Sequence, residues 1–381
     1  MDFRLTDEQE ELRVVLRRML ETLCTKEWLD DLESREEYPY ELFGRLAEMG
    51  LFGLGVPEEW GGVGGGMLDI AVVCEELGRF GGSVNMTYVP TAVFGNQTIL
   101  GGATDEMKAE LLPRMAAGEL RTAFALTEPE AGSDAAALRT RATPDGEGWI
   151  INGSKVFSTG AHVADYLVLS ARTGTSDSRH AGVSVFMVDA KAPGLTIKGI
   201  PKLGHNAVKT CEVGIVDVRV ESSALVGEVN RGWKALHRAL DAERIAVAAI
   251  CTGLSQRCTD MALEYGKQRQ QFGQPVASFQ AISHMLADME TETEASRLLT
   301  FKSAWLADQG LPASKVASIA KTFATEAATR QATRGMQILG GYSYTKEYEM
   351  ERFYREAKLY EVAGGTTQIQ RNIIAKEMGI R

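Results

Sequence analysis

The stretch DYLVLSAR, residues 165–172, is a short apolar run bounded by polar residues, as expected for a β-strand. Similar runs surround it on both sides, rich in Val and Ile and bounded by Gly, Asp, Asn or Pro: GWIING (148–153), VSVFMVD (183–189), LTIKGI (195–200) and EVGIVDVRV (212–220). They lie too close together along the chain for crossover helices between them. We therefore predict an antiparallel β domain, or a β-barrel, over residues 121–228.

The chain before this region has helical periodicity. Thr6 and Gln9 have the spacing of a capping box, and apolar residues at helical spacing follow them. Further helices are expected at 40–50, 68–80 and 104–117. Glycine and proline predict loops at VPEEWGGVGGG (56–66) and YVPTAVFGNQ (88–97). Residues 1–120 are thus expected to form an N-terminal α-helical domain.

The chain after the β region is helical again, with the break QILGGY at 337–342. Residues 229–381 are expected to form a four-helix bundle, giving an α+β fold of three domains. The expected helices are 233–268, 279–308, 313–339, 346–358 and 366–378. The 381 residues exceed what one hydrophobic core normally organises, which agrees with several domains.

Composition excludes several classes of function. The net charge is −10 and no long basic run occurs, which argues against a nucleic-acid partner. Five scattered cysteines without a C-x-x-C pair indicate reduced thiols, and the five histidines lack metal-ligand spacing. The charged start is unlike a secretory signal, and no apolar run could span a bilayer. We expect a cytoplasmic protein without a metal.

The glycine cluster 61–66 does not have G-x-G-x-x-G spacing and follows no predicted strand. A Rossmann dinucleotide site is therefore unsupported, and a nucleotide cofactor would have to bind in another way.

The segment FALTEPEAGSD, residues 124–134, resembles the signature of the acyl-CoA dehydrogenase family. The remaining chain is similar to that family in the same order. The matching blocks are PEEWGG (57–62) with LDIAVVCEELGR (68–79), INGSKVFSTGAHVADYLVLSAR (151–172), RQQFGQPVASFQAISHMLADM (269–289), QILGGYSYTKEYEMERFYREAKLYE (337–361) and GGTTQIQR (364–371). The resemblance implies FAD as the cofactor and an acyl-CoA thioester as the substrate.

By position, the resemblance also implies which residues bind these molecules. The flavin ring is expected to lie against Phe124, Leu126, Thr127, Phe157, Ser158 and Thr159. The pyrophosphate and adenosine of FAD are expected to contact Arg269, Gln271 and Phe272. Gln337 with Gly340 and Gly341, and Thr366 with Gln368, are expected to complete the cofactor contacts, and in the family those two groups come from neighbouring subunits. Acyl-CoA is expected to contact Ser133, Asp241 and Arg244. An Arg carries planar, always-charged donors suited to a diphosphate.

The family removes two hydrogens across Cα–Cβ of the thioester: a carboxylate takes the α-proton, and a hydride passes to flavin N5. In most members this base is a Glu directly before Gly-Thr in the final loop, where the present chain has Gly364. The Gly364 backbone N–H could still donate to the thioester carbonyl. A side-chain-free position 364 also suggests room for a bulky acyl group.

The isovaleryl-CoA and long-chain branches carry the base early in the first C-terminal helix, and the matching residue is Glu243. The helix that follows it is apolar on every side, so Glu243 is expected to be buried. Two alternatives stay open: a solvated first-turn Glu243, and Glu361 as the base.

The resemblance implies electron transfer to an electron-transfer flavoprotein and a homotetramer. Two other functions remain possible from the sequence: a base-deficient subunit that completes FAD sites for a different partner chain, and a flavin-dependent monooxygenase or nitrososynthase on the same scaffold. The acyl group of the substrate is left open.

Overall fold

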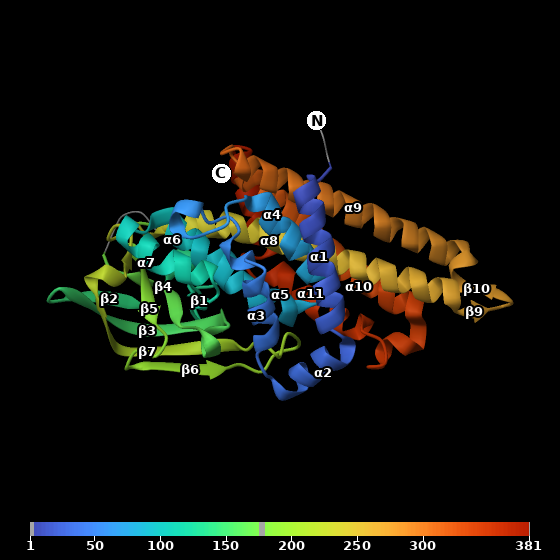
Figure 1. The fold of residues 1–381 in the computed structure, drawn as a ribbon, viewed down its shortest axis with the longest axis horizontal. Helices are drawn as coiled ribbons and strands as arrows, with labels where there is room; N and C mark the ends of the chain where they lie inside the picture. The colour runs from blue at the N-terminus through green and yellow to red at the C-terminus, as the bar shows by residue number, and fades with distance from the viewer. Residues whose placement is uncertain (1–3, 175–179, 381) are drawn as a thin grey trace.

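A computed structural model describes residues 4–174 and 180–380. Helices precede and follow a central region of strands (Figure 1). The predicted domain boundaries at 120/121 and 228/229 remain a proposal. The helices that come first are α1 (Asp7–Leu23), α2 (Lys26–Arg35), α3 (Tyr40–Glu48), α4 (Met67–Gly78), α5 (Gly82–Val89), α6 (Asn96–Gly102) and α7 (Asp105–Ala116).

The predicted capping box at the start of α1 is confirmed. The Gln9 N–H donates to Thr6 Oγ1, and the Thr6 N–H donates to Gln9 Oε1. Helix α2 was missed by the sequence analysis, although Thr25 accepts from the Trp28 N–H as an N-cap. Its buried residues, Leu29 and Leu32, have the spacing of one helix face, so the signal was present in the sequence.

The predicted loop at residues 88–97 is wrong, because the chain there is helical. A π-helical segment, Pro90–Gly95, connects α5 to α6. Pro90 stands at its first position, where the missing N–H costs least. The segment is buried, and the Asn96 side-chain amide donates to the Phe52 carbonyl at 2.8 Å. Tertiary packing thus outweighs the loop signal of Pro and Gly.

The middle of the chain forms one eight-stranded sheet. Its strands are β1 (Thr122–Ala125), β2 (Arg141–Asp145), β3 (Gly148–Thr159), β4 (Tyr166–Arg172), β5 (Val183–Asp189), β6 (Leu195–Gly199), β7 (Thr210–Glu221) and β8 (Leu225–Val226). Most pairings are antiparallel, as predicted, with the order β6-β7-β3-β2-β4-β5-β8. Two pairings of β4 are parallel, with β1 and with β2, because both strands enter the sheet from connections longer than a hairpin.

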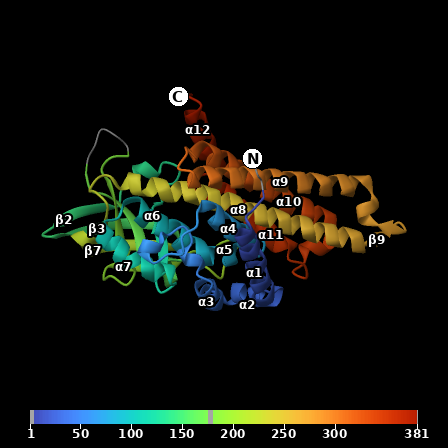
Figure 2. The ribbon, with the colours of Figure 1, turned by 45° about the horizontal axis from the view of Figure 1, so that its top comes forward.

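The last helices are α8 (Gly232–Gln268), α9 (Gln280–Asp308), α10 (Ser314–Leu339), α11 (Met350–Val362) and α12 (Thr367–Glu377). Helices α8, α9 and α10 lie side by side along the long axis of the molecule, and α8 reaches from the sheet to the small hairpin β9 (Gln270–Gln271) and β10 (Gln274–Pro275) (Figures 1 and 2). The predicted helix 346–358 begins four residues later than expected, at Met350.

Helix α8 is the central element of the largest hydrophobic core. Buried apolar residues on one stretch of it, including Ile245, Ile250 and Leu254, pack in one cluster with those of α4. The N-terminal helices are also joined to the bundle by Asp308 at the end of α9, which accepts hydrogen bonds from the Met67 and Leu68 N–H groups at the start of α4. Among the described residues, every helix is too short or too polar to cross a bilayer.

Candidate active site

Glu243 and Gly364 are brought into contact although 121 residues separate them in the sequence. Gly364 has φ +59°, and a Cβ built on it would lie 1.5 Å from Glu243 Oε1 and 2.4 Å from Glu243 Cδ. The Glu243 carboxyl group therefore fills the space in which a side chain at position 364 would begin. A carboxylate is present at this place, and it comes from α8.

The predicted burial of Glu243 is confirmed, since its side chain is 4% exposed. Its Oε2 is enclosed and accepts no hydrogen bond from any described residue. Glu243 therefore lies in the body of α8, beyond the first turn, and the alternative of a solvated first-turn Glu is wrong. The free space expected at position 364 is likewise absent, because the carboxyl group occupies it.

The turn that carries Gly364 is held from α10 and α12. Lys321 Nζ donates to the carbonyls of Ala363 at 2.6 Å, Gly364 at 2.5 Å and Gly365 at 2.9 Å. Gln370 Nε2 donates to the carbonyls of Gly364 and Gly365, both at 3.1 Å. The sequence analysis missed both residues, because nothing in the local sequence shows that distant side chains reach this turn.

Glu361, the competing candidate, has its carboxylate engaged elsewhere. It accepts from Thr329 Oγ1 at 2.5 Å and pairs with Lys358 Nζ at 2.6 Å. Burial acts to raise the pKa of Glu361, but the bonds from Lys358 and Thr329 outweigh it and hold the pKa below its ordinary value. An ionised carboxylate that is fixed by two donors is a poor proton acceptor.

Asp241 and Arg244, the expected CoA contacts, are bonded to each other one turn apart on α8. Asp241 also faces His237 Nδ1 at 3.4 Å. Burial acts to raise the pKa of Asp241, yet His237 and Arg244 outweigh it and lower the pKa. The Arg244 Nε–H is buried and has no partner among the described residues. Ser133, the third expected contact, is exposed.

The segments expected to hold the flavin ring lie next to each other. The Val156 N–H donates to the Thr127 carbonyl at 2.9 Å, which joins the chain after β1 to the end of β3. Phe124 is stacked on Phe94 with ring centroids 4.6 Å apart. Leu126 is buried, and Thr159 Oγ1 lies 2.9 Å from Thr210 Oγ1.

A buried ion pair fixes the segment after β1, and the sequence analysis did not predict it. Lys155 Nζ donates to Glu128 Oε1 at 2.8 Å and to the Leu126 carbonyl at 3.0 Å. Glu128 also accepts from the N–H groups of Arg139 and Thr140. Burial lowers the pKa of Lys155 to about 8 despite the neighbouring Glu128 carboxylate. The Glu of the T-E-P motif is thus bound into the protein, pointing away from bulk solvent.

The residues expected at the FAD pyrophosphate and adenosine form a separate group at the far end of α8. Arg269 ends that helix, and its guanidinium lies 5.9 Å from the ring of Tyr342, next to Gly341. Gln271 is exposed on the hairpin, and Phe272 beside it is 94% exposed. Gly340, at φ +63°, ends α10, and Gln337 is exposed. Thr366, the N-cap of α12, and the exposed Gln368 belong instead to the chain that directly follows the Gly364 turn.

Comparison with known proteins agrees with this arrangement over the whole chain. The N-terminal, middle and C-terminal domains of acyl-CoA dehydrogenase match residues 6–119, 123–218 and 230–379. The chain belongs to the acyl-CoA dehydrogenase family. It is 38% identical to a probable acyl-CoA dehydrogenase, YngJ, of Bacillus subtilis (strain 168), over 99% of this chain and 100% of the relative.

Two further family members show the range of this similarity. The Caffeyl-CoA reductase-Etf complex subunit CarC of Acetobacterium woodii is 36% identical over 97% of this chain and 98% of its own. The structure of butyryl-CoA dehydrogenase from Megasphaera elsdenii has a TM-score of 0.95 at 34% identity, covering 99% of this chain and 100% of that one.

Acyl-CoA dehydrogenases are FAD-dependent oxidoreductases, and the residues present here fit a flavin. Phe157, at φ +60°, is 65% exposed beside the Thr127 segment, which leaves a large apolar face for a planar ring to cover. The Ser158 hydroxyl is buried without a hydrogen-bond partner among the described residues. The exposed aromatic and basic side chains of Phe272 and Arg269 suit an adenine and a diphosphate.

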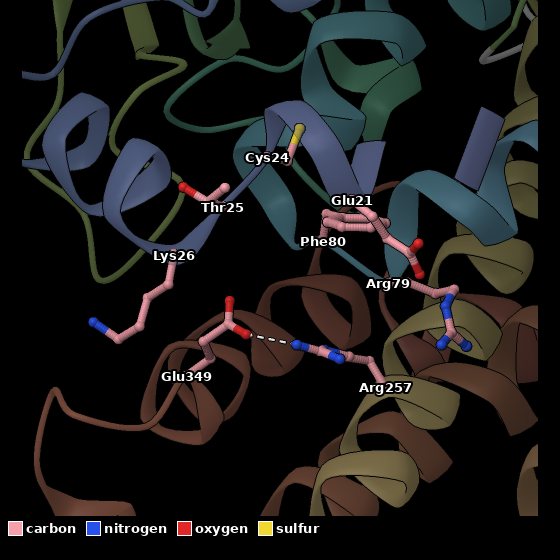
Figure 3. A pocket seen from close by; sticks show the side chains of 8 residues that line it. All are labelled: Glu21, Cys24, Thr25, Lys26, Arg79, Phe80, Arg257 and Glu349. Atoms are coloured by element: carbon pink, nitrogen blue, oxygen red, sulfur yellow. Dashed lines mark hydrogen bonds and ion pairs between the residues drawn. The ribbon is translucent and has the colours of Figure 1, made fainter. Parts of the chain in front are cut away.

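A cavity of about 230 Å³ lies elsewhere in the protein, between α1, α2, α4, α8 and α11 (Figure 3). The Arg257 guanidinium donates to the Glu349 carboxylate across it at 2.7 Å. Arg79, Lys26 and Arg257 each have a carboxylate partner. The cavity is therefore charge-balanced, and none of the expected FAD or acyl-CoA contacts lines it.

His162, three residues after Thr159, is expected to make the stability of the fold depend on pH. Burial, together with Lys209 and Lys202, lowers the pKa of His162 to about 4, and both ring nitrogens lack a partner among the described residues. The unfolded chain then binds a proton between about pH 6.5 and pH 4 that the folded chain does not. Stability is therefore lost as the pH falls through this window.

We expect His162→Gln to reduce this acid sensitivity. The melting temperature of the wild-type holoenzyme should fall more steeply between pH 6.5 and pH 4 than that of the variant, as measured by differential scanning calorimetry. His284→Gln, at an exposed position on α9, is the control and should keep the wild-type slope. Parallel profiles for wild type and His162→Gln would contradict a neutral buried His162.

Proposed function

We propose that this protein is an FAD-dependent acyl-CoA dehydrogenase in which Glu243 is the base that removes the α-proton of the thioester. The observation that carries the proposal is the 1.5 Å between Glu243 Oε1 and the position of a Cβ on Gly364. Most of the family places its base carboxylate on the residue at this position. Here α8 supplies a carboxylate to the same space.

The other side chains have separate tasks in this mechanism. Glu243 takes the α-proton, and its unpaired Oε2 leaves it free to accept one. The Gly364 N–H, which donates to no described backbone carbonyl, would face the thioester carbonyl and stabilise charge that develops there. Arg244 and Asp241 would bind the CoA portion, with Ser133 at the mouth. Bound FAD supplies the acceptor for the hydride that leaves Cβ.

The segments Phe124–Thr127 and Phe157–Thr159 would hold the flavin ring within one subunit. The adenosine end of FAD requires a second subunit. Glu243 and Arg269 are 26 residues apart on one helix, which is about 39 Å at 1.5 Å per residue. An FAD molecule cannot bridge this span, so Arg269, Gln271, Phe272, Gln337, Gly340 and Gly341 would serve the site of a neighbouring copy. This supports an assembly of at least two copies, which a homotetramer would also provide. Thr366 and Gln368 follow Gly364 directly, so they would contact FAD in the site of their own subunit.

Phe272→Asp is expected to weaken both assembly and cofactor retention, because a charge would enter a surface that a partner and FAD cover. The expected result is smaller particles in analytical ultracentrifugation and loss of flavin absorbance after gel filtration. Val216→Asp, at an apolar side chain 65% exposed on β7, is the matched control and should change neither. A Phe272→Asp monomer that keeps all of its FAD would contradict the shared site.

We propose an electron-transfer flavoprotein as the electron acceptor, supported by the relative from Acetobacterium woodii, whose name places it in a complex with such a protein. The function is tested by adding a panel of acyl-CoA thioesters without oxygen and following bleaching of the flavin. Bleaching by at least one of them, and reoxidation by electron-transfer flavoprotein, is the expected result. Holoenzyme that no acyl-CoA bleaches would favour the base-deficient subunit, and consumption of NAD(P)H with oxygen would favour the monooxygenase.

A further inference from the structure

Lys321, in the first half of α10, has a buried ammonium group without an ion-pair partner among the described residues. Its side chain is 1% exposed, and the described residues include no ion-pair partner for it. All three donors of the ammonium group are used by the consecutive carbonyls of Ala363, Gly364 and Gly365. Burying an ammonium ion without a counter-ion costs free energy of folding. We therefore expect an interaction or a function that offsets this cost.

The negative charge of Glu243 offsets part of this cost. Burial lowers the pKa of Lys321, and the charge of Glu243 is the largest effect that acts against it, while Arg244 adds to the lowering. Glu243 and Lys321 thus attract each other through space without a direct bond. Both touch the same residue: Lys321 binds the Gly364 carbonyl, and Glu243 occupies the Cβ position of Gly364.

The turn depends on this support. Gly364 and Gly365 have φ +59° and +80°, so two successive residues adopt the left-handed conformation. Glycine enters this conformation freely but loses the most conformational entropy when fixed. Lys321, with Gln370, is what fixes the turn among the described residues. A shift of this turn would move the Gly364 N–H and open the space that confines the Glu243 carboxyl group.

We propose that Lys321 is a positioning residue, which locks the Ala363–Gly365 turn so that the Glu243 carboxyl group and the Gly364 N–H keep their places around the thioester. This rests on the proposed function. Lys321 contacts neither substrate nor cofactor in the proposal, and it acts through the turn.

Lys321→Met tests the proposal, because Met has a similar length without charge or donors. We expect anaerobic flavin bleaching to slow about 10²-fold, the effect of misplacing a reacting group by about 1 Å, while acyl-CoA affinity changes by less than about threefold. The FAD content should stay that of the wild type. Lys302→Met, at an exposed position on α9, is the matched control and should bleach at the wild-type rate.

Two more variants keep the test decisive if Lys321→Met does not fold. Lys321→Ala should regain bleaching when ethylammonium is added, and the same concentration of ethanol should have no effect. Gln370→Leu removes the other two bonds to the turn without touching the buried charge, and it should slow bleaching more than it weakens binding.

The results separate the two ideas. Wild-type protein that bleaches normally, with Lys321→Met or Gln370→Leu at the wild-type rate or no rescue by ethylammonium, would overturn the role of Lys321 alone. Wild-type holoenzyme that no acyl-CoA bleaches would overturn the proposed function itself.

Discussion

Glu243→Gln is expected to slow flavin bleaching by acyl-CoA about 10²- to 10⁴-fold, the usual contribution of a general base. Glutamine has the shape of glutamate but cannot accept the α-proton. The variant should keep its FAD, because no expected flavin contact is changed. Its melting temperature should not fall, since the substitution removes a buried carboxyl group whose Oε2 has no partner among the described residues.

The measurement is stopped-flow absorbance under anaerobic conditions, with the acyl-CoA that bleaches the wild type fastest. Glu264→Gln, at an exposed position of the same helix, is the control for the chemical change and should leave the rate unaltered. A Glu243→Gln enzyme that turns over at nearly the wild-type rate would show that another group is the base. Glu361→Gln would then be the next variant to measure.

The second large effect is expected at Gly364. Gly364→Ala places a Cβ where Glu243 Oε1 now lies, at 1.5 Å, and forces an L side chain into φ +59°. We expect bleaching to slow about 10²-fold because the carboxyl group must move away from the thioester. Gly365→Ala would place a Cβ at φ +80°, 2.9 Å from Gln370 Nε2 and 3.4 Å from Ile369 Cγ2, so it disturbs the turn without meeting the Glu243 carboxyl group.

Moving the carboxylate from the helix to the turn is the stricter test. The double variant Glu243→Ala with Gly364→Glu vacates the space on one side and fills it from the other. We expect the flavin of the double variant to bleach at least about tenfold faster than that of Glu243→Ala alone. It should still bleach more slowly than in the wild type, because a non-glycine residue at position 364 strains the backbone. Equal bleaching rates for the single and the double variant would mean that a carboxylate at position 364 cannot replace the one at position 243.

The sequence was sufficient to predict most of the fold, because long helices and short strands differ in hydrophobic period. It failed at residues 88–97, where Pro90 and Gly95 suggested a loop and burial imposed a helix. The sequence analysis also missed the two strands that pair with β4 in parallel. The order of strands depends on how the connections run between them, and the hydrophobic period of a segment carries no information about this.

The candidate site was predictable only in part. The matched blocks indicated Glu243 and Gly364 separately, and the apolar residues after Glu243 correctly indicated its burial. The direct contact between Glu243 and Gly364 could not be read from the sequence. The same is true of the roles of Lys321 and Lys155, because their partners are backbone carbonyls and a carboxylate far away in the chain. Buried lysines of this kind look like ordinary surface residues until the fold places them.

Because one small volume admits a carboxyl group from α8 or a side chain from residue 364, but not both, the two arrangements are alternatives that exclude each other. A chain that carried both glutamates would have to move one of the two carboxyl groups out of this volume. In the present chain the carboxyl group comes from α8, and residue 364 is a glycine.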